Sequence, residues 1–537
     1  MTESEIPLLL QRASESLLSA RRENVYAALV VLVGVYFAGA FLFPRRPNFP
    51  SINYDKSEWT NKEAISKFRS SSKKLLADGF KKFSGPFNIV TDVGPLIMLS
   101  PDYIEAVNHE PKLDFFQYIN EDLLGKYETF VNFRPQLPGF AEEVVMKGLT
   151  RSLRLSSANG HTCEAKFTKA LSDESTSVLH DTWGESKEWH DVDLRANVLT
   201  WIARLSSRIF NGELLTNNEE WLTISKEFTV NLFTATRQVK QYPTLLRWPA
   251  ERLLPLCRKT RAQIAAATRL LAPIFQERNA EITAAKREGR EPNLPNDAIE
   301  PSQWSRSAAR GRPYNPVNTL MGLSLAAIHT TSDLLGQALL NVCAHPEMVE
   351  PLRAEAIEVL KKHGWKKQAV AELYLMDSFF KETQRVKPIS MSHMHRLAME
   401  DVELPGGVKI RKGERMGISS HKMWSGPEWE NPETFDGYRF LNRRKTPGFE
   451  HKSLLISTSA DHTAFSHGKH ACPGRFFAAN EVKIAMVHLI LKYDMKLKDA
   501  KDAKWFEYGL SMSANPFAKI SVRRRKEEID LDTSAVE

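Results

Sequence analysis

Residues Val25 to Phe43 form the stretch that most limits how the N-terminal part of this chain can fold. These 19 residues carry no charged side chain. As an α-helix they would span roughly 28 Å, close to the thickness of the hydrocarbon core of a bilayer. Arginines at positions 21, 22, 45 and 46 flank the run on both sides. The pattern predicts a single transmembrane anchor at residues 25–43, preceded by a leader of residues 1–24.

A cleaved signal peptide is the alternative for this segment, because Ala38-Gly39-Ala40 offers a small-x-small cleavage site. The leader is long and carries acids, however, and the apolar run continues past that site. We therefore predict an uncleaved anchor. Residues 44–50 follow with three prolines, which indicates a stiff hinge before the remainder of the chain at residues 51–537.

The composition of the 537-residue chain excludes several classes of protein. Its four cysteines show no CxxC spacing, which argues against a disulfide framework or a cysteine-rich zinc site. The net charge of +8 is mild for this length and the basic residues are scattered, so we expect no nucleic-acid partner. A membrane surface or an acidic protein partner suits this charge better.

Helical periodicity dominates the rest of the chain, and only short stretches alternate as strands do. We expect helices at residues 62–78, over most of 160–290, and at 317–344, 347–362, 370–386 and from just after Cys472 to about 492. Two strands are expected within 87–101 and a small sheet region within 402–418, whereas the polar, proline-rich residues 286–316 indicate a surface connection. The predicted fold class is mainly α with a minor β region.

Cys472 stands just before the last predicted helix, between two histidines and a Pro-Gly pair. Pro473 suits a first helical position, and Gly474 lets the backbone come close to whatever the cysteine contacts. The helix N-terminus favours a thiolate over a thiol, and Lys469 and Arg475 add positive charge nearby. The local sequence therefore predicts an anionic sulfur.

Three chemical roles suit such a thiolate. It could be a nucleophile with His467 or His470 as its base. It could be a zinc ligand, with His467, His470 and Cys472 as three ligands and no evident fourth. It could also be the axial ligand of a haem iron. Spacing alone does not decide among them.

The run Phe465-x-x-Gly468-x-x-x-Cys472-x-Gly474 resembles the haem-binding loop of the cytochrome P450 monooxygenases. The resemblance implies that Cys472 is the proximal thiolate ligand of haem b, that Phe465 packs beside the sulfur and that Gly468 permits the turn. A proximal thiolate pushes electron density onto the iron and favours O–O cleavage. The resemblance further implies that His470 bonds a haem propionate, and it leaves His467 without a role.

Glu382 and Arg385 stand three residues apart in a predicted helix, and hence on one face. Most such pairs are exposed and contribute little to stability. The family, however, has a Glu-x-x-Arg pair before its small sheet region, joined by an Arg from a later aromatic segment. Arg439 in "FDGYRF" matches that Arg, although Gly437 and Tyr438 depart from the usual Pro and acid.

The segment "AAIHTTSD" lies mid-way along the helix predicted at 317–344 and is similar to the oxygen-binding segment of the family. The match implies that Ala326 and Ala327 make room for O2 and that Thr330 relays protons. His329 occupies the position of the usual acid, where it could equally shuttle protons or be a satisfied polar group. The alternatives are close helix packing for the two alanines and a bond back to the preceding turn for Thr330.

Arg396 matches a family position that pairs with a haem propionate, and its guanidinium suits a carboxylate. The motifs follow the family's order, which implies one large cytochrome P450 fold, a haem-thiolate monooxygenase domain at 51–537. The residues in these motifs are similar to those of fungal biosynthetic enzymes that act on polycyclic terpenoids, indole diterpenes or reduced polyketides. We therefore expect a small apolar polycyclic substrate of secondary metabolism. By family layout, the substrate would contact Leu323, Ala326, Ala327, Ile389, Met391 and Met512.

The family mechanism implies that one oxygen atom from O2 enters a C–H bond, with electrons from NADPH through NADPH-cytochrome P450 reductase. Because that reductase works from the cytosol, we expect a single-pass protein of the endoplasmic reticulum membrane with a cytosolic catalytic domain. One alternative is a haem-thiolate isomerase, dehydratase or peroxide-using enzyme, to which His329 gives some support. The other is a non-enzymatic haem- or zinc-binding protein.

Overall fold

The computed structural model describes residues 48–54, 61–133, 139–150, 163–290, 292–293 and 308–532, together with the single positions Asn24 and Gly34. Chain contacts divide it into two units, Met1–Asn48 and Phe49–Glu537. Nearly all of the predicted leader, anchor and hinge lies outside the described residues. Within the described part of the chain, no helix is both long and apolar enough to cross a bilayer.

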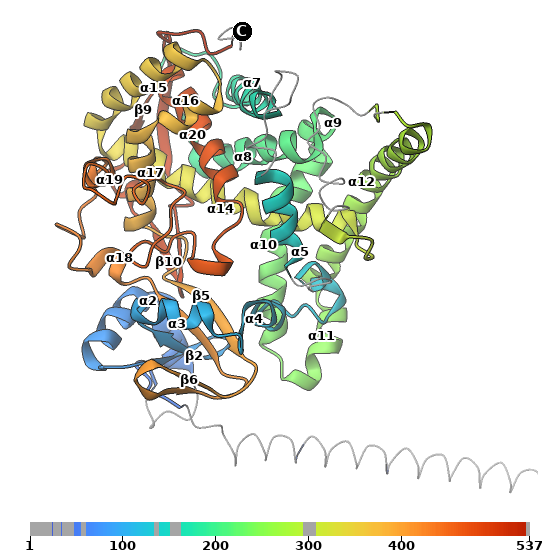
Figure 1. The fold of residues 1–537 in the computed structure, drawn as a ribbon, viewed down its shortest axis with the longest axis vertical. Coiled ribbons are helices and arrows are strands. Elements are labelled where there is room, and N and C mark those ends of the chain that lie inside the picture. The colour runs from blue at the N-terminus through green and yellow to red at the C-terminus, as the bar shows by residue number, and fades with distance from the viewer. Residues whose placement is uncertain are drawn as a thin grey trace, which may run out of the picture. The chain divides into compact units, whose positions relative to one another are not determined.

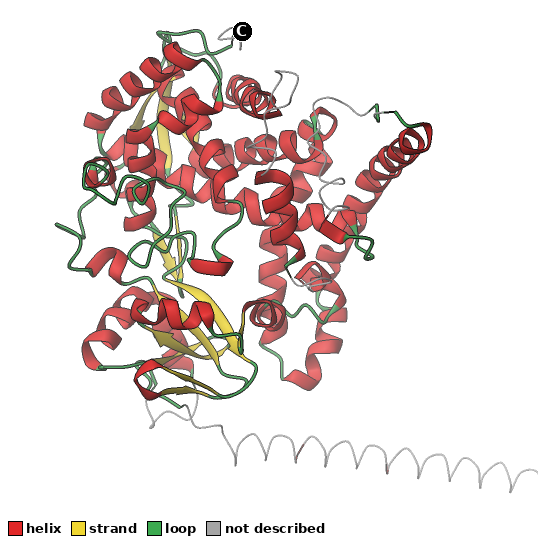
Figure 2. Ribbon diagram, viewed as in Figure 1, coloured by secondary structure: helices red, strands yellow, loops and turns green. Residues whose placement is uncertain are grey.

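Helices make up most of the Phe49–Glu537 unit, and strands are few (Figures 1 and 2). The predicted mainly helical fold with a minor sheet is confirmed. The helices are α2 (Lys62–Lys82), α3 (Ile104–His109), α4 (Phe115–Asp122), α5 (Phe140–Glu143), α7 (Cys163–Trp183), α8 (Leu194–Asn211), α9 (Glu213–Thr216), α10 (Glu219–Lys240), α11 (Arg247–Leu253), α12 (Pro255–Glu288), α14 (Pro316–Ala344), α15 (Val349–His363), α16 (Lys367–Glu372), α17 (Tyr374–Val386), α18 (Lys422–Ser425), α19 (Arg439–Arg443) and α20 (Arg475–Lys492).

Two of these helices differ from the sequence-based prediction in an informative way. The helix predicted at 370–386 is divided at Leu373, whose ψ of 71° is not helical, into α16 and α17. The last helix begins at Arg475 with Gly474 as its N-cap. Pro473 therefore precedes the cap and does not occupy the predicted first helical position.

Helix α14 runs through the middle of the helical packing (Figure 1). Asn315 caps its N-terminus by accepting a hydrogen bond from the N–H of Asn318, and Pro316 occupies the first turn, where no N–H partner is needed. The helix contacts α8, α10, α12, α17 and α20, and most of its apolar side chains belong to the main core. Residues in its middle turns are therefore held in a fixed position inside the fold.

The strands form one five-stranded sheet and three smaller ones. The large sheet has the order β1-β2-β8-β5-β3, in which β2 and β8 are parallel and the other neighbours antiparallel. The strands are β1 (Phe87–Thr91), β2 (Gly94–Leu99), β3 (Leu113–Asp114), β4 (His190–Asp193), β5 (Ser392–Ala398), β6 (Val402–Leu404), β7 (Val408–Ile410), β8 (Arg415–Ser419), β9 (Tyr493–Leu497), β10 (Phe506–Tyr508), β11 (Ser511–Ser513) and β12 (Lys519–Arg524).

An irregularity in β5 sets the direction of Arg396. The register of β5 against β8 shifts between His393 and Arg396, and Met394 between them has a positive φ of 51°. Such bulges bend a strand and change the direction of the side chains that follow.

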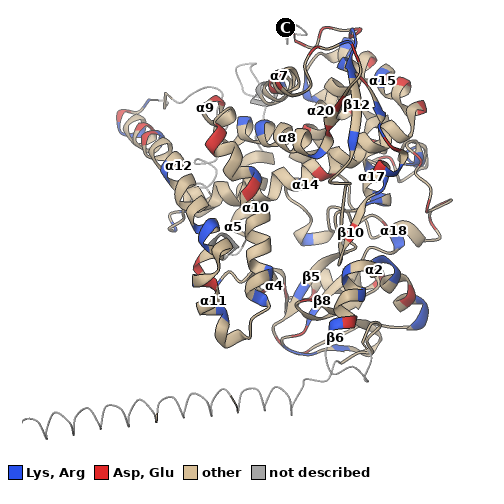
Figure 3. Ribbon diagram, turned by 180° about the vertical axis from the view of Figure 1, so that it is seen from behind, with Lys and Arg blue, Asp and Glu red and all other residues tan. Residues whose placement is uncertain are grey.

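The basic and acidic residues are interspersed over most elements and do not gather on one of them (Figure 3).

Candidate functional site

The loop before α20 is closed tightly around Gly468. The N–H of Cys472 donates to the carbonyl of Phe465 at 2.8 Å, and the N–H of Lys469 donates to Oδ1 of Asn108 on α3 at 2.7 Å. Gly468 has a φ of +72°, and a Cβ at this position would lie 2.0 Å from that same Oδ1. Only glycine fits there, because both the backbone angle and the close approach of Asn108 exclude a side chain.

The thiol of Cys472 lies at the N-terminal end of α20. The N–H groups of Gly474 and Arg475 and the charge of Arg475 all favour its thiolate form, but burial outweighs them and raises the pKa of Cys472. The anionic sulfur therefore stays a prediction, because burial on one side and the N–H groups and Arg475 on the other act on the thiol in opposite directions. A Cβ at Gly474 would meet no atom within 4 Å, so the space at this position, two residues after Cys472, is open.

His470 and Arg396, the two predicted propionate partners, share contacts with Phe115 of α4. The His470 ring stacks on Phe115 at 5.0 Å and its Nδ1 lies 3.1 Å from Oε1 of Glu142. The Arg396 guanidinium lies 5.6 Å from the same ring. Arg396 is only 3% exposed, yet the one hydrogen bond of its guanidinium within the described residues goes to the carbonyl of His395.

These surroundings fit haem at the Cys472 loop. Burial lowers the pKa of Arg396 to about 10, although the charges of Asp114 and Glu142 act in the opposite direction. No carboxylate among the described residues forms an ion pair with it. A buried guanidinium with spare donors suits a propionate. His470 fits less directly, because Glu142 already occupies its Nδ1. On α14, Ala326 and Thr330 are exposed although the helix is largely buried, which leaves space on that side.

Glu382, Arg385 and Arg439 are brought together as one buried network. Arg385 and Glu382 are both 0% exposed and form two hydrogen bonds, Nε to Oε2 at 2.7 Å and Nη2 to Oε1 at 2.8 Å. The remaining Nη1 of Arg385 donates to the carbonyls of Met423 and Pro432. Arg439 donates from Nε to Oε1 of Glu382 at 3.0 Å. The carboxylate is thus held by two guanidinium groups from separate helices.

Thr330 and His329 bond in different directions from α14. The Thr330 hydroxyl donates to the carbonyl of Ala326 at 2.7 Å, the bond to the preceding turn that the sequence left open. Nε2 of His329 lies 2.8 Å from the carbonyl of Lys226 on α10, so this nitrogen carries the proton. Burial, the largest effect, lowers the pKa of His329, which keeps the ring neutral near pH 7.

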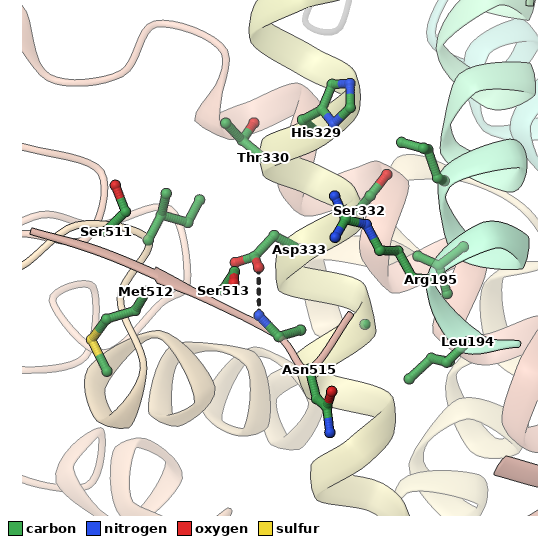
Figure 4. A pocket seen from close by; sticks show the side chains of 15 residues that line it. Leu194, Arg195, His329, Thr330, Ser332, Asp333, Ser511, Met512, Ser513 and Asn515 are labelled. Atoms are coloured by element: carbon green, nitrogen blue, oxygen red, sulfur yellow. Dashed lines mark hydrogen bonds between the residues drawn. The ribbon is translucent and has the colours of Figure 1, made fainter. Parts of the chain in front are cut away.

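A pocket of about 290 Å³ lies beside Thr330 (Figure 4). Its walls are formed by α8, by α14 and by residues 511–515, which comprise β11 and the two residues that follow it. Thr330 and Asp333 project on the side of α14 that faces β11, whereas His329 and Ser332 project toward α8. Of the predicted substrate contacts, Ile389 and Met512 line this pocket, and Leu323, Ala326, Ala327 and Met391 do not. Leu323 and Met391 are buried in core clusters.

Sequence reasoning missed an ion pair at the wall of this pocket. Asp333, one turn after Thr330, pairs through Oδ2 with Nζ of Lys387 and accepts at Oδ1 from the N–H of Ala514 at 2.7 Å. It missed Arg195 of α8 as well, which lines the same pocket. Asp333 could have been found from the sequence, because it lies three residues after Thr330 and hence on the same face of the helix. No sequence pattern predicts that α8 packs beside this part of α14.

The remaining predicted residues have ordinary surroundings. Phe465 packs against the main core. Nδ1 of His467 lies 3.0 Å from the hydroxyl of Thr458, and burial lowers the pKa of His467. In the described part of the chain, no three His, Cys, Asp or Glu side chains are grouped to hold a metal ion. The zinc site considered for His467, His470 and Cys472 is therefore not formed.

Comparison with known proteins gives one consistent result. A sequence profile described as Cytochrome P450 matches residues 96–520. The chain is 38% identical to cytochrome P450 monooxygenase ntnM of Nectria sp, over 87% of this chain and 86% of that protein. It is 38% identical to cytochrome P450 monooxygenase esdpI of Penicillium shearii, over 94% and 96% of the two chains. The crystal structure of the cytochrome P450DA haem domain shares the fold, with a TM-score of 0.65 at 16% identity over 89% of this chain and 97% of that one.

Proposed function

This chain belongs to the cytochrome P450 family and is a monooxygenase, and on that premise we propose that it inserts one oxygen atom from O2 into a C–H bond of an apolar polycyclic substrate of fungal secondary metabolism. The observation that carries the proposal is the closed loop that holds Cys472 at the start of α20. The apolar wall of the pocket beside Thr330 supports the substrate class. It consists of Leu194, Val198, Leu199, Ile389 and Met512.

The family and the fold imply haem with a cysteine thiolate ligand, and we assign haem b. When bound, the haem supplies the activation of O2. Cys472 would be its axial ligand, and Arg396 would bind a propionate through the donors that have no partner among the described residues. Binding would favour the thiolate, because a nearby cation lowers the pKa that burial raises.

Thr330 is the proposed proton relay. Its hydroxyl hydrogen is donated to Ala326, which leaves the oxygen lone pairs free to accept from the pocket side. His329 lines the same pocket, but its Nε2 proton is held by the carbonyl of Lys226. We therefore assign proton transfer to Thr330, and to His329 the positioning of α14 against α10.

We assign NADPH-cytochrome P450 reductase as the electron donor and the endoplasmic reticulum membrane as the location, with the catalytic domain in the cytosol. The uncharged run at 25–43 supports a single-pass anchor. A second support is a group of apolar side chains on α11 and the turn before it, which are between 50% and 72% exposed and flanked by arginines. They are Leu245, Leu246, Trp248 and Leu253. Such a surface suits a lipid interface.

The test is to express the full chain with the reductase and to screen polycyclic substrates under ¹⁸O2. We expect NADPH consumption, one labelled oxygen in the product and a red-shifted thiolate band in the carbon monoxide difference spectrum. Cys472→Ala should lose both the band and the activity, whereas Cys343→Ala, a matched change at another partly buried cysteine, should keep them. A product without label would instead favour the isomerase, dehydratase or peroxide-using alternative.

A further inference from the structure

The pocket beside Thr330 has a positively charged end that a purely apolar substrate would not use. Arg195 lies in the first turn of α8 and lines this pocket. Its side chain reaches from α8 toward α14 (Figure 4). No hydrogen bond or ion pair joins its guanidinium to any residue that the structure describes. A guanidinium in this situation has all its donors available to a ligand.

The one carboxylate in the pocket lining does not neutralise Arg195. Asp333 is already paired with Lys387, which is 2% exposed, and it also accepts the N–H of Ala514. Lys387 does not line the pocket, so the positive charge that neutralises Asp333 lies outside the pocket. No carboxylate of the pocket lining therefore pairs with Arg195, whose side chain is exposed.

His329, the remaining titratable side chain in the lining, contributes no negative charge. Its Nε2–H donates to Lys226 and its ring is neutral, partly because the positive charge of Arg195 acts on it. The rest of the lining combines apolar side chains with serines and Asn515. One pocket thus offers a hydrocarbon wall, a single unpaired cation and the hydroxyl of Thr330.

We propose that Arg195 binds a carboxylate of the substrate, so that the substrate is a polycyclic carboxylic acid and not a neutral hydrocarbon. The planar guanidinium matches a carboxylate with two parallel hydrogen bonds. The acid group would lie at the α8 side, with the ring system along Val198 and Leu199 toward Thr330. This inference rests on the proposed function and names the substrate class of the same site.

The experiment uses the full-length holoenzyme and a matched pair of probes, abietic acid and methyl abietate, which differ in the negative charge. Binding is measured by the shift of the haem absorption band. Wild-type protein should bind the acid about tenfold more tightly than the ester, the order expected for a charge-assisted pair at a partly open site. Arg195→Gln should bind the acid about tenfold more weakly and leave ester affinity unchanged, and Arg195→Lys should keep part of the preference.

Arg269→Gln is the control for simple loss of positive charge, because Arg269 is an exposed arginine of α12 outside the pocket, and it should behave as wild type. The proposal is overturned by equal affinity for acid and ester in the wild type, by no binding of either compound, or by a preference that survives in Arg195→Gln. The carbon monoxide difference spectrum of the same samples keeps this result separate from the proposed function, since an intact thiolate band with no acid preference would contradict only the carboxylate assignment.

Discussion

The Glu382–Arg385 network and the Asp333 pocket both hold charged side chains inside the fold, but they hold them differently. In the network, Glu382 and Arg385 are completely buried, and every nitrogen of the Arg385 guanidinium has an acceptor. In the pocket, Asp333 is 16% exposed and buried Lys387 pairs with it, while Arg195 of the same pocket lining is exposed and has no partner among the described residues. The first region is closed to ligands, and the second keeps unused bonding capacity.

This difference indicates a division between a rigid frame and a region that can adapt to a substrate. The network joins α17 to α19, and Lys381 of α17 also donates to the carbonyls of Leu454 and Ser457 in the segment that precedes the Cys472 loop. The pocket is assembled from α8, α14 and the segment after β11, which lie far apart in the sequence. Substitutions in the frame should therefore affect folding and haem uptake, and substitutions in the pocket should affect ligand binding and coupling.

The largest effect is expected from Arg385→Met, which leaves the Glu382 carboxylate buried with only Arg439 as a charged partner. Removing one member of a buried pair costs about 3–5 kcal/mol. We expect a loss of that order in the free energy of unfolding, measured by urea denaturation, and a lower fraction of haem-loaded protein. Lys67→Gln, which breaks an exposed pair with Glu63, should change stability by less than about 0.5 kcal/mol. Similar stability of the two variants would show that the network is not a frame.

The next effect concerns the ion pair behind the pocket. Lys387→Met leaves Asp333 with a backbone N–H as its only partner among the described residues, and should cost about 2–3 kcal/mol in urea denaturation. The double variant with Asp333→Asn removes the stranded charge and should recover most of that loss. In Lys387→Met alone, the unbalanced Asp333 would also weaken the acid preference at Arg195. If the double variant is no more stable than Lys387→Met, the two residues are not coupled.

The sequence predicts the frame far better than the pocket, for physical reasons. Gly468 and Cys472 belong to one loop, and Glu382 and Arg385 to one helical turn, so their geometry follows from local spacing. The position of Arg195 depends on how α8 packs against α14, which no local pattern contains. The burial of Cys472 likewise depends on the fold as a whole.

At Cys472, the effects of the helix N-terminus and of nearby charges can be inferred from neighbouring residues, whereas the effect of burial on its pKa cannot. The link between His470 and Glu142 likewise joins residues far apart in the chain, and only the folded structure reveals it. Predictions that rest on short-range spacing therefore deserve a direct test by substitution, and those on the pocket a test by ligand binding.

Thr330→Ala should affect coupling and leave the frame unchanged. The substitution removes the hydroxyl that bonds to Ala326 on the pocket side of α14. If this hydroxyl relays protons, the product formed per NADPH should fall by roughly tenfold or more and hydrogen peroxide should rise. Thr330→Ser keeps the hydroxyl and should keep most of the coupling. Unfolding by urea should hardly change in either variant, and unchanged coupling in Thr330→Ala would assign this threonine to packing alone.

The smallest effect that separates the two regions is on acid stability. His488 of α20 is completely buried, with Nε2 2.9 Å from the hydroxyl of Ser172, and burial lowers its pKa well below the ordinary value. Because the unfolded chain binds a proton on this ring near pH 6.5 and the folded chain does not, its contribution to stability is complete above that pH and is lost as the pH falls toward the lowered pKa.

As the pH falls through that range, each such histidine lowers the free energy of unfolding by about 1.4 kcal/mol per pH unit. His488→Gln should remove this slope between pH 6.5 and 5, as measured by urea denaturation at several pH values. His329→Gln in the pocket should remove less of it, because the ring is only partly buried. A larger change for His329 than for His488 would reverse the comparison, since it would make the pocket the more strongly desolvated of the two regions.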